Sequence, residues 1–298
     1  MPEPRFPIRL LALDIDGTLV GPDLALRNRT IEAVRAAVHR GVIVSLVTGR
    51  MASSAHDVAE VLGLTAPIVA HQGAVIRSMP TPGSRLTGRL LRHLPLSAET
   101  ARAAVEWSQA NGLDPHLNHL ERLVMRADDP RADDYSRFLG VQAVLEPDLG
   151  AAIRGPVTKV IAVADAPWPV TVLEPARRQF AGRAMVTVSH PRFLEFVAPG
   201  VSKGTAVHWL ARRFGVPLSQ AMAIGDQYGD LEMLVEVGHG VAMPHAPGPV
   251  IAAARHIAPP LEDEGAAQMI EVFVLHHRHG PAATAPAIAA GARGPRPG

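Results

Sequence analysis

The sequence predicts an α/β fold, a doubly wound Rossmann-like parallel sheet with a second α/β unit inserted into it. Apolar runs at residues 8–13 (IRLLAL) and 42–47 (VIVSLV) lack alternation, as expected for parallel strands that are buried on both faces. A helical pattern follows each run, and strands that alternate with helices favour a parallel sheet. The same texture resumes at Ser202, after a middle segment of different composition.

The first part of the predicted sheet covers residues 1–79. After the first strand, the loop VGPD at 20–23 leads into a helix that ends at Gly41. The apolar stripe of this helix consists of Ile31, Val34, Ala37 and Val38. A second helix is expected at about 52–62, after the second strand, and PIVA at 67–70 predicts a third strand.

The middle of the chain, residues 80–197, predicts a cap domain of its own. Residues 79–95 are rich in Pro, Gly, Ser and Thr and predict a linker or a β excursion. A helix is expected at 97–110, and strands are expected at 113–118, 121–126, 157–163 and 184–189. The insert of about 115 residues is long enough to fold around its own core.

Residues 198–275 return to the first texture and complete the predicted sheet. Helices at 202–214, 228–237, 247–254 and 264–275 alternate with strands at 221–224 and 240–243 and with one further short strand. The tail, residues 276–298, lacks periodicity, and we expect it to be disordered.

Composition narrows the classes of function. The chain has 298 residues, a formal net charge of +1 and scattered basic residues, so neither nucleic acid nor a membrane is an expected partner. It contains no cysteine, which excludes disulfides, thiol catalysis and cysteine-bound metals. No signal peptide or membrane span is expected, and a cytoplasmic location is the default interpretation. Nothing in the sequence predicts an oligomeric state.

A pair of carboxylates follows the first predicted strand. Asp14 and Asp16 are two residues apart, so their side chains are expected to point the same way, and Gly17 allows a sharp turn. Neighbouring carboxylates repel each other unless a cation lies between them, and hard oxygen ligands suit Mg²⁺. The alternative is that both aspartates only cap the turn. The loop lacks the ligand pattern of an EF-hand.

Two further stretches predict phosphate binding. TGR, Thr48 to Arg50, follows the second strand, where a hydroxyl and helix-start amides can hold a phosphate oxygen; an ordinary N-cap is the alternative. Lys203 begins a helix, where the helix dipole disfavours a cation unless an anion is near; a solvated lysine is the alternative. Only two of the 29 basic residues, Lys159 and Lys203, are lysines, which favours a function for a retained lysine.

The stretch GDQYGD, at 225–230, places two more carboxylates at a strand end. It follows the apolar run AMAI and precedes a helical pattern. Strand ends of this kind collect functional groups in open α/β sheets. We therefore expect Asp226 and Asp230 to join the site of Asp14.

Together, LALDIDGTLV, TGR, VSKG and GDQYGD resemble the motifs of the haloacid dehalogenase superfamily of phosphohydrolases in their order, strand context and spacing. The resemblance covers residues 1–75 and 195–275 and leaves the middle of the chain as the family's variable cap. The insert follows the third strand, which is where a type 2 (C2) cap lies. APGVSKGTAVHWL and GVAMPHAP resemble the Cof-like branch, which dephosphorylates small phosphorylated metabolites, including sugar phosphates and phosphorylated cofactors.

The resemblance implies a role for each matching residue. Asp14 would attack phosphorus and form an aspartyl-phosphate, while Asp16 would protonate the leaving alkoxide and then activate water. The implied phosphate-binding residues are Thr48, Gly49, Arg50 and Lys203. The implied Mg²⁺ ligands are Asp14, the backbone carbonyl of Asp16, and Asp226, with Asp230 supporting them.

The sequence departs from the family pattern at three places. Gly229 stands where the family usually has an asparagine that contacts the substrate phosphate, and the usual NGA after the third strand is QGA, beginning at Gln72. Pro244 and His245 replace a usual Gly-Asn pair. If the missing amide limits phosphate binding, Gly229→Asn should raise kcat/KM.

The expected function is a Mg²⁺-dependent phosphatase of small phosphorylated metabolites. A phosphosugar mutase or a phosphatase dedicated to one sugar phosphate is an alternative, because the cap decides between these outcomes. A weakly active or non-catalytic phosphometabolite-binding protein is a further alternative, because Gly229 removes a polar contact.

Several residues of the predicted cap could reach a substrate. His116, Asn118 and His119 could line the substrate side, although packing within the cap is as good an interpretation. For Glu195, in FLEFV, an ordinary strand position is favoured over a role in substrate selection.

Overall fold

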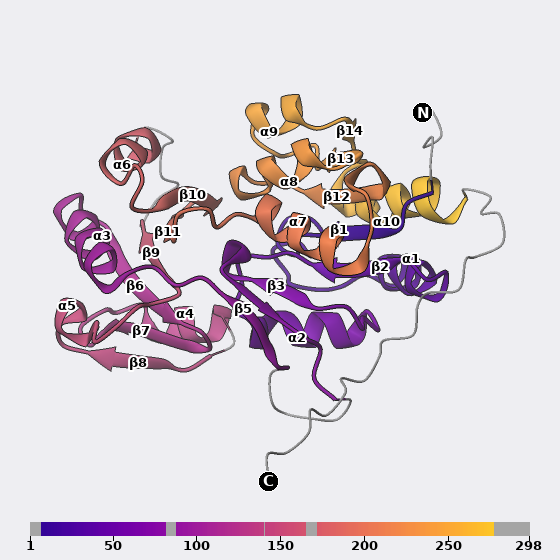
Figure 1. Ribbon diagram of the computed structural model, residues 1–298. Coiled ribbons are helices and arrows are strands. Elements are labelled where there is room, and N and C mark those ends of the chain that lie inside the picture. The colour runs from indigo at the N-terminus through magenta and orange to yellow at the C-terminus, as the bar shows by residue number, and fades with distance from the viewer. Residues whose placement is uncertain (1–6, 82–87, 140, 165–171, 277–298) are drawn as a thin grey trace, which may run out of the picture.

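The computed structural model describes residues 7–81, 88–139, 141–164 and 172–276. These residues form two lobes (Figure 1). The core is built on a five-stranded sheet from the first and last parts of the chain, and the cap is built on a six-stranded sheet from the middle part. The domain boundaries at 80 and 197 stay predictions, and the expected disordered tail lies, from residue 277 on, outside the described residues.

The core sheet is parallel throughout and has the order β14-β13-β12-β1-β2. Its strands are β1 (Leu10–Leu13), β2 (Ile43–Leu46), β12 (Ala221–Gly225), β13 (His239–Ala242) and β14 (His256–Ile257). The apolar run of β1 reflects burial on both faces: Leu11 and Leu13 pack on one face of the sheet, while Leu10 and Ala12 pack on the other. The prediction of a buried parallel sheet is confirmed.

Helices cover both faces of the core sheet. One face packs against helices α1 (Asn28–His39), α2 (Ala52–Val61) and α10 (Gly265–Ile270). Helix α10 continues as a short π-helix over Glu271–Leu275. The other face packs against helices α7 (Lys203–Phe214), α8 (Leu231–Glu236) and α9 (Gly248–Ala253). The predicted helix at 228–237 begins with a separate 3-10 turn, Tyr228–Asp230, because Asp230 caps the turn through its own side chain.

The third predicted strand has a different partner from the one expected. Strand β3 (Ile68–Ala70) is linked to the core sheet by one parallel bridge, between Val47 and Val69, and otherwise pairs antiparallel with β4 (Val75–Arg77). Strand β5 (Leu90–His93), within the predicted linker or β excursion, pairs with β4. This small sheet leads the chain from the core to the cap.

The cap is a mixed sheet with helices packed on it. The sheet has the order β10-β11-β9-β6-β7-β8. Its strands are β6 (Asp114–His119), β7 (Arg122–Arg126), β8 (Ala143–Glu146), β9 (Lys159–Val163), β10 (Met185–His190) and β11 (Phe193–Val197). Its helices are α3 (Ala98–Ala110), α4 (Ala132–Leu139), α5 (Leu149–Ala152) and α6 (Leu173–Gln179).

The two faces of the cap sheet differ in chemistry. One face packs against α3 and α6 through an aromatic cluster in which Trp107, Phe180 and Phe196 meet edge to face. Because side chains alternate along a strand, the residues between these apolar positions point to the opposite face. That face carries Lys159 and Glu195 toward the core.

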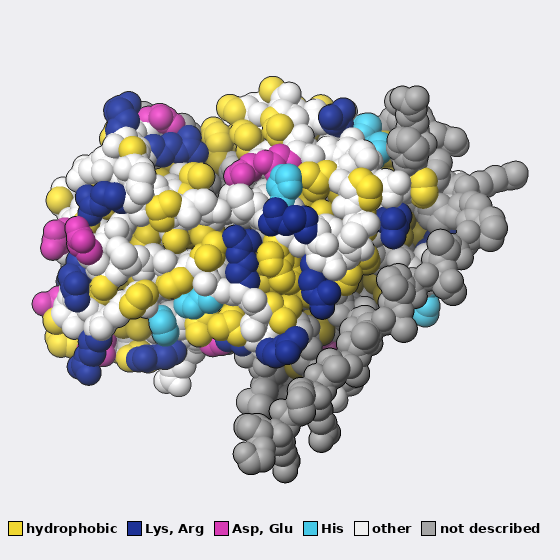
Figure 2. Space-filling model, viewed as in Figure 1, with side chains coloured by type: hydrophobic (Ala, Val, Ile, Leu, Met, Phe, Trp, Pro, Cys, Tyr) yellow, Lys and Arg dark blue, Asp and Glu magenta, His cyan; other side chains and the backbone are white. Residues whose placement is uncertain are grey.

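Two properties of the described residues bear on partners. None of their helices is long and apolar enough to cross a membrane. On the face shown in Figure 2, lysine and arginine side chains are dispersed among apolar and uncharged ones, without a contiguous basic patch.

Candidate active site

The candidate site lies where the core strands end. The register pairs Leu13 with both Ile224 and Leu46, so the residues that follow β1, β12 and β2 leave the sheet at one edge. Asp14, Asp226 and Thr48 are at these positions. Lys203 enters from the side as the first residue of α7, a helix that begins with a capping box between Ser202 and Thr205.

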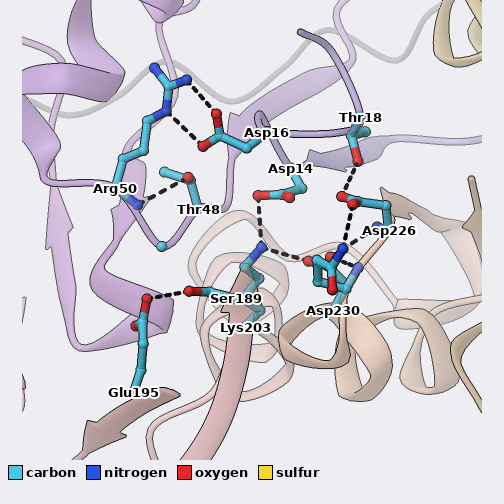
Figure 3. A network of polar contacts seen from close by, with 12 residues as sticks. Asp14, Asp16, Thr18, Thr48, Arg50, Ser189, Glu195, Lys203, Asp226 and Asp230 are labelled. Atoms are coloured by element: carbon cyan, nitrogen blue, oxygen red, sulfur yellow. Dashed lines mark hydrogen bonds and ion pairs between the residues drawn. The ribbon is translucent and has the colours of Figure 1, made fainter. Parts of the chain in front are cut away.

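Lys203 joins two of the aspartates. Its Nζ lies 2.7 Å from Oδ1 of Asp14 and 2.6 Å from Oδ1 of Asp230, and Figure 3 shows it between them. Burial lowers the pKa of Lys203, but the attraction of Asp14 and Asp230 outweighs burial, so the pKa lies above its ordinary value. Lys203 is therefore a permanent buried cation, not a solvated surface lysine.

The same burial acts in the opposite direction on the carboxyls. Burial raises the pKa of Asp14 well above its ordinary value, and the neighbouring Asp230 and Asp226 raise it further against the pull of Lys203. Burial likewise raises the pKa of Asp230. The ionised cluster thus carries more negative charge than Lys203 can balance.

This surplus charge makes the cluster suitable for a divalent cation. Oxygens of Asp14, Asp226 and Asp230 lie within 4.8 Å of one another, and all three residues are buried. Carboxylate oxygens without sulfur or imidazole suit Mg²⁺. Gly17, with φ of +77°, lets the chain pass Asp226 closely, because an added Cβ would lie 2.3 Å from Oδ2 of Asp226.

Asp230 and Asp226 are held differently. Oδ2 of Asp230 accepts hydrogen bonds from the backbone amides of Asp226 and Gln227, at 2.9 and 2.8 Å. Its two oxygens therefore fix the loop and Lys203. Asp226 accepts hydrogen bonds from two side chains, that of Thr18 at 3.1 Å (Figure 3) and that of Gln227 at 3.1 Å.

Asp16 and Arg50 form a pair beside this cluster. Nε of Arg50 donates to Oδ2 of Asp16 at 2.8 Å, and a second bond joins the guanidinium to Oδ1 (Figure 3). The neighbouring Thr48 is buried, and its hydroxyl accepts a hydrogen bond from the Arg50 amide at 3.1 Å. The hydroxyl proton of Thr48 is thereby left to donate to a ligand.

The cap supplies a second buried network. Nζ of Lys159 donates to Oε2 of Glu195 and to the backbone carbonyl of Gly49, both at 2.8 Å. Oε1 of Glu195 accepts a hydrogen bond from Ser189 (Figure 3). Gly49 belongs to the core, so Lys159 fastens the cap sheet to the loop that carries Thr48.

Core and cap together enclose a pocket of about 520 Å³. Every residue predicted for the site except Asp230 lines it: Asp14, Asp16, Thr48, Gly49, Arg50, Lys203 and Asp226. Asp230 is fully buried behind Lys203. His116, Asn118 and His119 are not among the lining residues; His116 instead approaches Asp129 at 3.3 Å.

Sequence reasoning missed part of this arrangement. Glu195, for which an ordinary strand position was favoured, is 2% exposed, paired with Lys159 and part of the pocket wall. The rarity of lysine was the signal for Lys159. Three further residues contact Asp226. His245 stands at a departure from the family pattern, whereas no signal marked Thr18 or Gln227.

Comparisons with known proteins agree with the geometry. A family model described as haloacid dehalogenase-like hydrolase matches residues 11–270. A phosphatase of Cronobacter sakazakii, HMP-PP phosphatase, is 27% identical over 268 residues, which are 90% of this chain and 95% of that protein. A 5-amino-6-(5-phospho-D-ribitylamino)uracil phosphatase of Bacillus subtilis is 27% identical over 269 residues, 90% and 96% of the two chains.

The fold is also that of solved structures. The crystal structure of a haloacid dehalogenase-like hydrolase from Bacteroides thetaiotaomicron superimposes with a TM-score of 0.74 at 26% identity. The match covers 89% of this chain and 98% of that one. Both the parallel core sheet and the mixed cap sheet therefore lie within the shared fold.

Proposed function

Because the chain belongs to the haloacid dehalogenase-like hydrolases, we propose that its phosphatase activity removes phosphate from small phosphorylated metabolites at Asp14. The observation that carries the proposal is the buried ion pair of Asp14 with Lys203, surrounded by Asp16, Thr48 and Asp226 in one pocket. Phosphoryl transfer needs an oxygen nucleophile and positive charge around the phosphoryl oxygens. This group of residues supplies both.

The chemistry follows from the positions of the two first aspartates. Oδ1 of Asp14 is bound to Lys203, and Oδ2 has no hydrogen-bond partner among the described residues, so Oδ2 is available to attack phosphorus. The ester P–O bond breaks as the Asp14–phosphorus bond forms, and Asp16 gives its proton to the leaving oxygen. Asp16 then takes a proton from water, which attacks phosphorus and releases phosphate and the Asp14 carboxylate.

Lys203 and Thr48 bind the phosphoryl group in this proposal. Lys203 neutralises oxygen charge that grows in the transition state, and the Thr48 hydroxyl donates a hydrogen bond to a phosphoryl oxygen. Arg50 holds Asp16 in the described structure, and a bound phosphate ester competes with Asp16 for its guanidinium. The competition frees the Asp16 carboxyl to face the leaving oxygen.

Mg²⁺ is the proposed cofactor. Asp14 and Asp226 would hold it together with the backbone carbonyl of Asp16, and Asp230 would support them through its bonds to the loop. The bound ion would offset the surplus negative charge of the cluster and withdraw charge from the phosphoryl oxygens.

The cap side of the pocket points to the class of substrate. Ser189 and Glu195 offer polar contacts, while Ile161 and Phe193 offer apolar ones, in a pocket the size of a small metabolite. A phosphorylated compound with hydroxyl groups or a polar ring fits this mixture. Two similar proteins, the HMP-PP phosphatase and the 5-amino-6-(5-phospho-D-ribitylamino)uracil phosphatase, act on compounds of this class and support the proposal.

A substrate panel tests the proposal. Protein loaded with Mg²⁺ is assayed for phosphate release from an aryl phosphate, from sugar phosphates and from phosphorylated pyrimidine compounds. Turnover that requires Mg²⁺ and is lost in Asp14→Asn is the expected result. Absence of turnover on the whole panel, by folded and Mg²⁺-loaded protein, would contradict the proposal.

A further inference from the structure

Gln72 is a buried polar residue without a role in the mechanism above. Its side chain is 2% exposed and lines the pocket. Neither Nε2 nor Oε1 of its carboxamide makes a hydrogen bond to any described residue. A buried amide without partners is costly, so the ligand that enters this pocket is expected to satisfy it.

Two glycines form the space that holds this carboxamide. A Cβ added at Gly49 would lie 2.7 Å from Nε2 of Gln72, and a Cβ added at Gly229 would lie 3.0 Å from its Oε1. Both loops therefore approach the amide more closely than a side chain would allow. The carboxamide lies between the loop that carries Thr48 and the loop that carries Asp226.

The backbone fixes Gln72 in this place. Its backbone N–H donates a hydrogen bond to the backbone carbonyl of Thr48 at 3.0 Å. Gln72 and the preceding His71 both have positive φ, 60° and 50°, which residues other than glycine and asparagine rarely adopt. Strain of this kind persists where the surrounding structure enforces it and is concentrated at functional sites.

We infer that Gln72 binds the phosphoryl group, its amide N–H donating a hydrogen bond to a phosphoryl oxygen beside Thr48 and Lys203. Gly229 leaves the room that this longer side chain occupies. The two departures from the family pattern, at Gln72 and Gly229, are thus one exchange, in which the amide is supplied from the other side of the pocket. The inference rests on the proposed function, because it assigns a ligand to the same pocket.

The inference reverses the expectation for Gly229→Asn. Alone, an asparagine at this position pushes against Oε1 of Gln72 and displaces the carboxamide, so kcat/KM falls. Combined with Gln72→Asn, whose shorter side chain withdraws from the space, the new asparagine has room. We expect the double variant to recover at least fivefold over either single variant, an order-of-magnitude figure for one restored hydrogen bond.

The test measures the affinity of Mg²⁺-loaded protein for inorganic phosphate by calorimetry, together with kcat/KM for an aryl phosphate. Gln72→Met keeps the length of the side chain but loses the amide, and we expect both quantities to fall about 10- to 100-fold. Gln72→Glu places a negative charge near phosphate and is expected to lose more. Gln220→Ala is the matched control, since Gln220 also has a buried amide oxygen without a partner but does not line the pocket.

The outcomes separate the two proposals. Phosphate affinity and kcat/KM that stay within twofold in Gln72→Met and Gln72→Glu, in an active enzyme, overturn the role of Gln72 and leave the phosphatase standing. If the wild-type protein hydrolyses no ester, a loss of phosphate binding in Gln72→Met still supports the role of Gln72 in binding phosphate. If Gln72→Met unfolds, as judged by its melting temperature, Gln72→Asn takes its place in the same measurements. Asparagine tolerates the positive φ, and its shorter side chain withdraws the amide from the space, so the same losses are expected.

Discussion

The two lysines of this protein are both buried at the pocket, one in the core and one in the cap, and their surroundings differ. Lys203, in the core, pairs with Asp14 and Asp230 and has Asp226 near them. Lys159, in the cap, pairs with Glu195 and with a carbonyl oxygen. The core side holds more negative than positive charge, whereas the cap pair is balanced.

This difference separates two uses of a buried charge. An unbalanced cluster is costly until a cation or a substrate completes it, so its residues serve binding and catalysis at the expense of stability. A balanced and fully hydrogen-bonded pair holds structure, and losing one partner leaves the other uncompensated. Substitutions on the core side should therefore reduce activity, and substitutions of one cap partner should reduce stability.

The largest expected effect is on the core side. Asp14→Asn should lower kcat for an aryl phosphate by about 10⁴-fold or more, because the proposed nucleophile is lost. Burial raises the pKa of Asp14, so an ionised Asp14 carboxylate destabilises the folded protein at neutral pH. The neutral asparagine should therefore not lower the free energy of unfolding of the metal-free protein.

Kinetics and urea unfolding of the same samples measure both quantities. Asp57→Asn, at an exposed position of α2, is the control and should change neither. An Asp14→Asn protein that keeps a hundredth of the activity, or that unfolds more easily than the wild type by more than about 1 kcal/mol, a typical single-mutation cost, breaks the comparison.

The cap pair should show the reverse pattern. Lys159→Met leaves Glu195 buried without its cation and should lower the free energy of unfolding by about 3–5 kcal/mol. The double variant Lys159→Met/Glu195→Leu should recover most of this loss, since apolar replacement of a whole buried pair is often neutral.

A double-mutant cycle by urea unfolding measures this coupling. The exposed pair of Arg177 and Glu174 on α6 is the control, with an expected coupling below about 1 kcal/mol. A cap double variant as unstable as Lys159→Met would show that the pair is not a balanced structural unit.

Binding of Mg²⁺ should affect the core cluster and the cap pair differently, with an effect of intermediate size on the free energy of unfolding. Mg²⁺ at a hundred times its Kd should stabilise the protein by about 2.7 kcal/mol, because the proposed site exists in the folded cluster and not in the unfolded chain. Asp226→Asn should abolish this stabilisation, while Lys159→Met/Glu195→Leu should keep it in full. Unfolding with EDTA and with Mg²⁺ gives the difference, and equal Mg²⁺ effects in the two variants would refute the assignment to the core side.

The core side could be predicted from the sequence much further than the cap side. Asp14 and Thr48 directly follow apolar runs, and Asp226 follows one after Gly225. Because parallel strands bring their carboxyl ends to one edge of the sheet, this local pattern was sufficient. The bond of Lys159 to Gly49 joins residues 110 positions apart, one in a strand of the cap sheet and the other in a loop of the core. No periodicity encodes such a contact, because it depends on how cap and core dock.

The antiparallel pairing of the 67–70 strand was missed for a related reason. An apolar run of this length predicts a buried strand but not its partner. The turn at His71 to Gly73, with positive φ at all three residues, sends the chain back along β3 instead of into a helix. Two of these residues are not glycine, so no turn signal marked the reversal.

The smallest expected effect lies where the two regions meet. Nε2 of His71, in the core, lies 3.0 Å from the carbonyl oxygen of Leu120 in the cap. Burial, and then the charge of Lys159, lower the pKa of His71 well below its ordinary 6.5. Below pH 6.5 the unfolded chain therefore binds a proton that the folded protein does not. The free energy of unfolding then decreases as the pH is lowered, by at most about 1.4 kcal/mol per pH unit.

His71→Asn should remove this slope and match the wild type in pH dependence above pH 7, because asparagine tolerates the positive φ and does not titrate. Urea unfolding of both proteins between pH 5 and 8 measures the difference. In Lys159→Met the pKa of His71 should rise and the slope should shrink, which ties this contact to the cap. If the free energies of unfolding of the wild type and of His71→Asn have the same pH dependence below pH 6.5, His71 is protonated in the folded protein. The contact between cap and core would then tolerate the charge of His71.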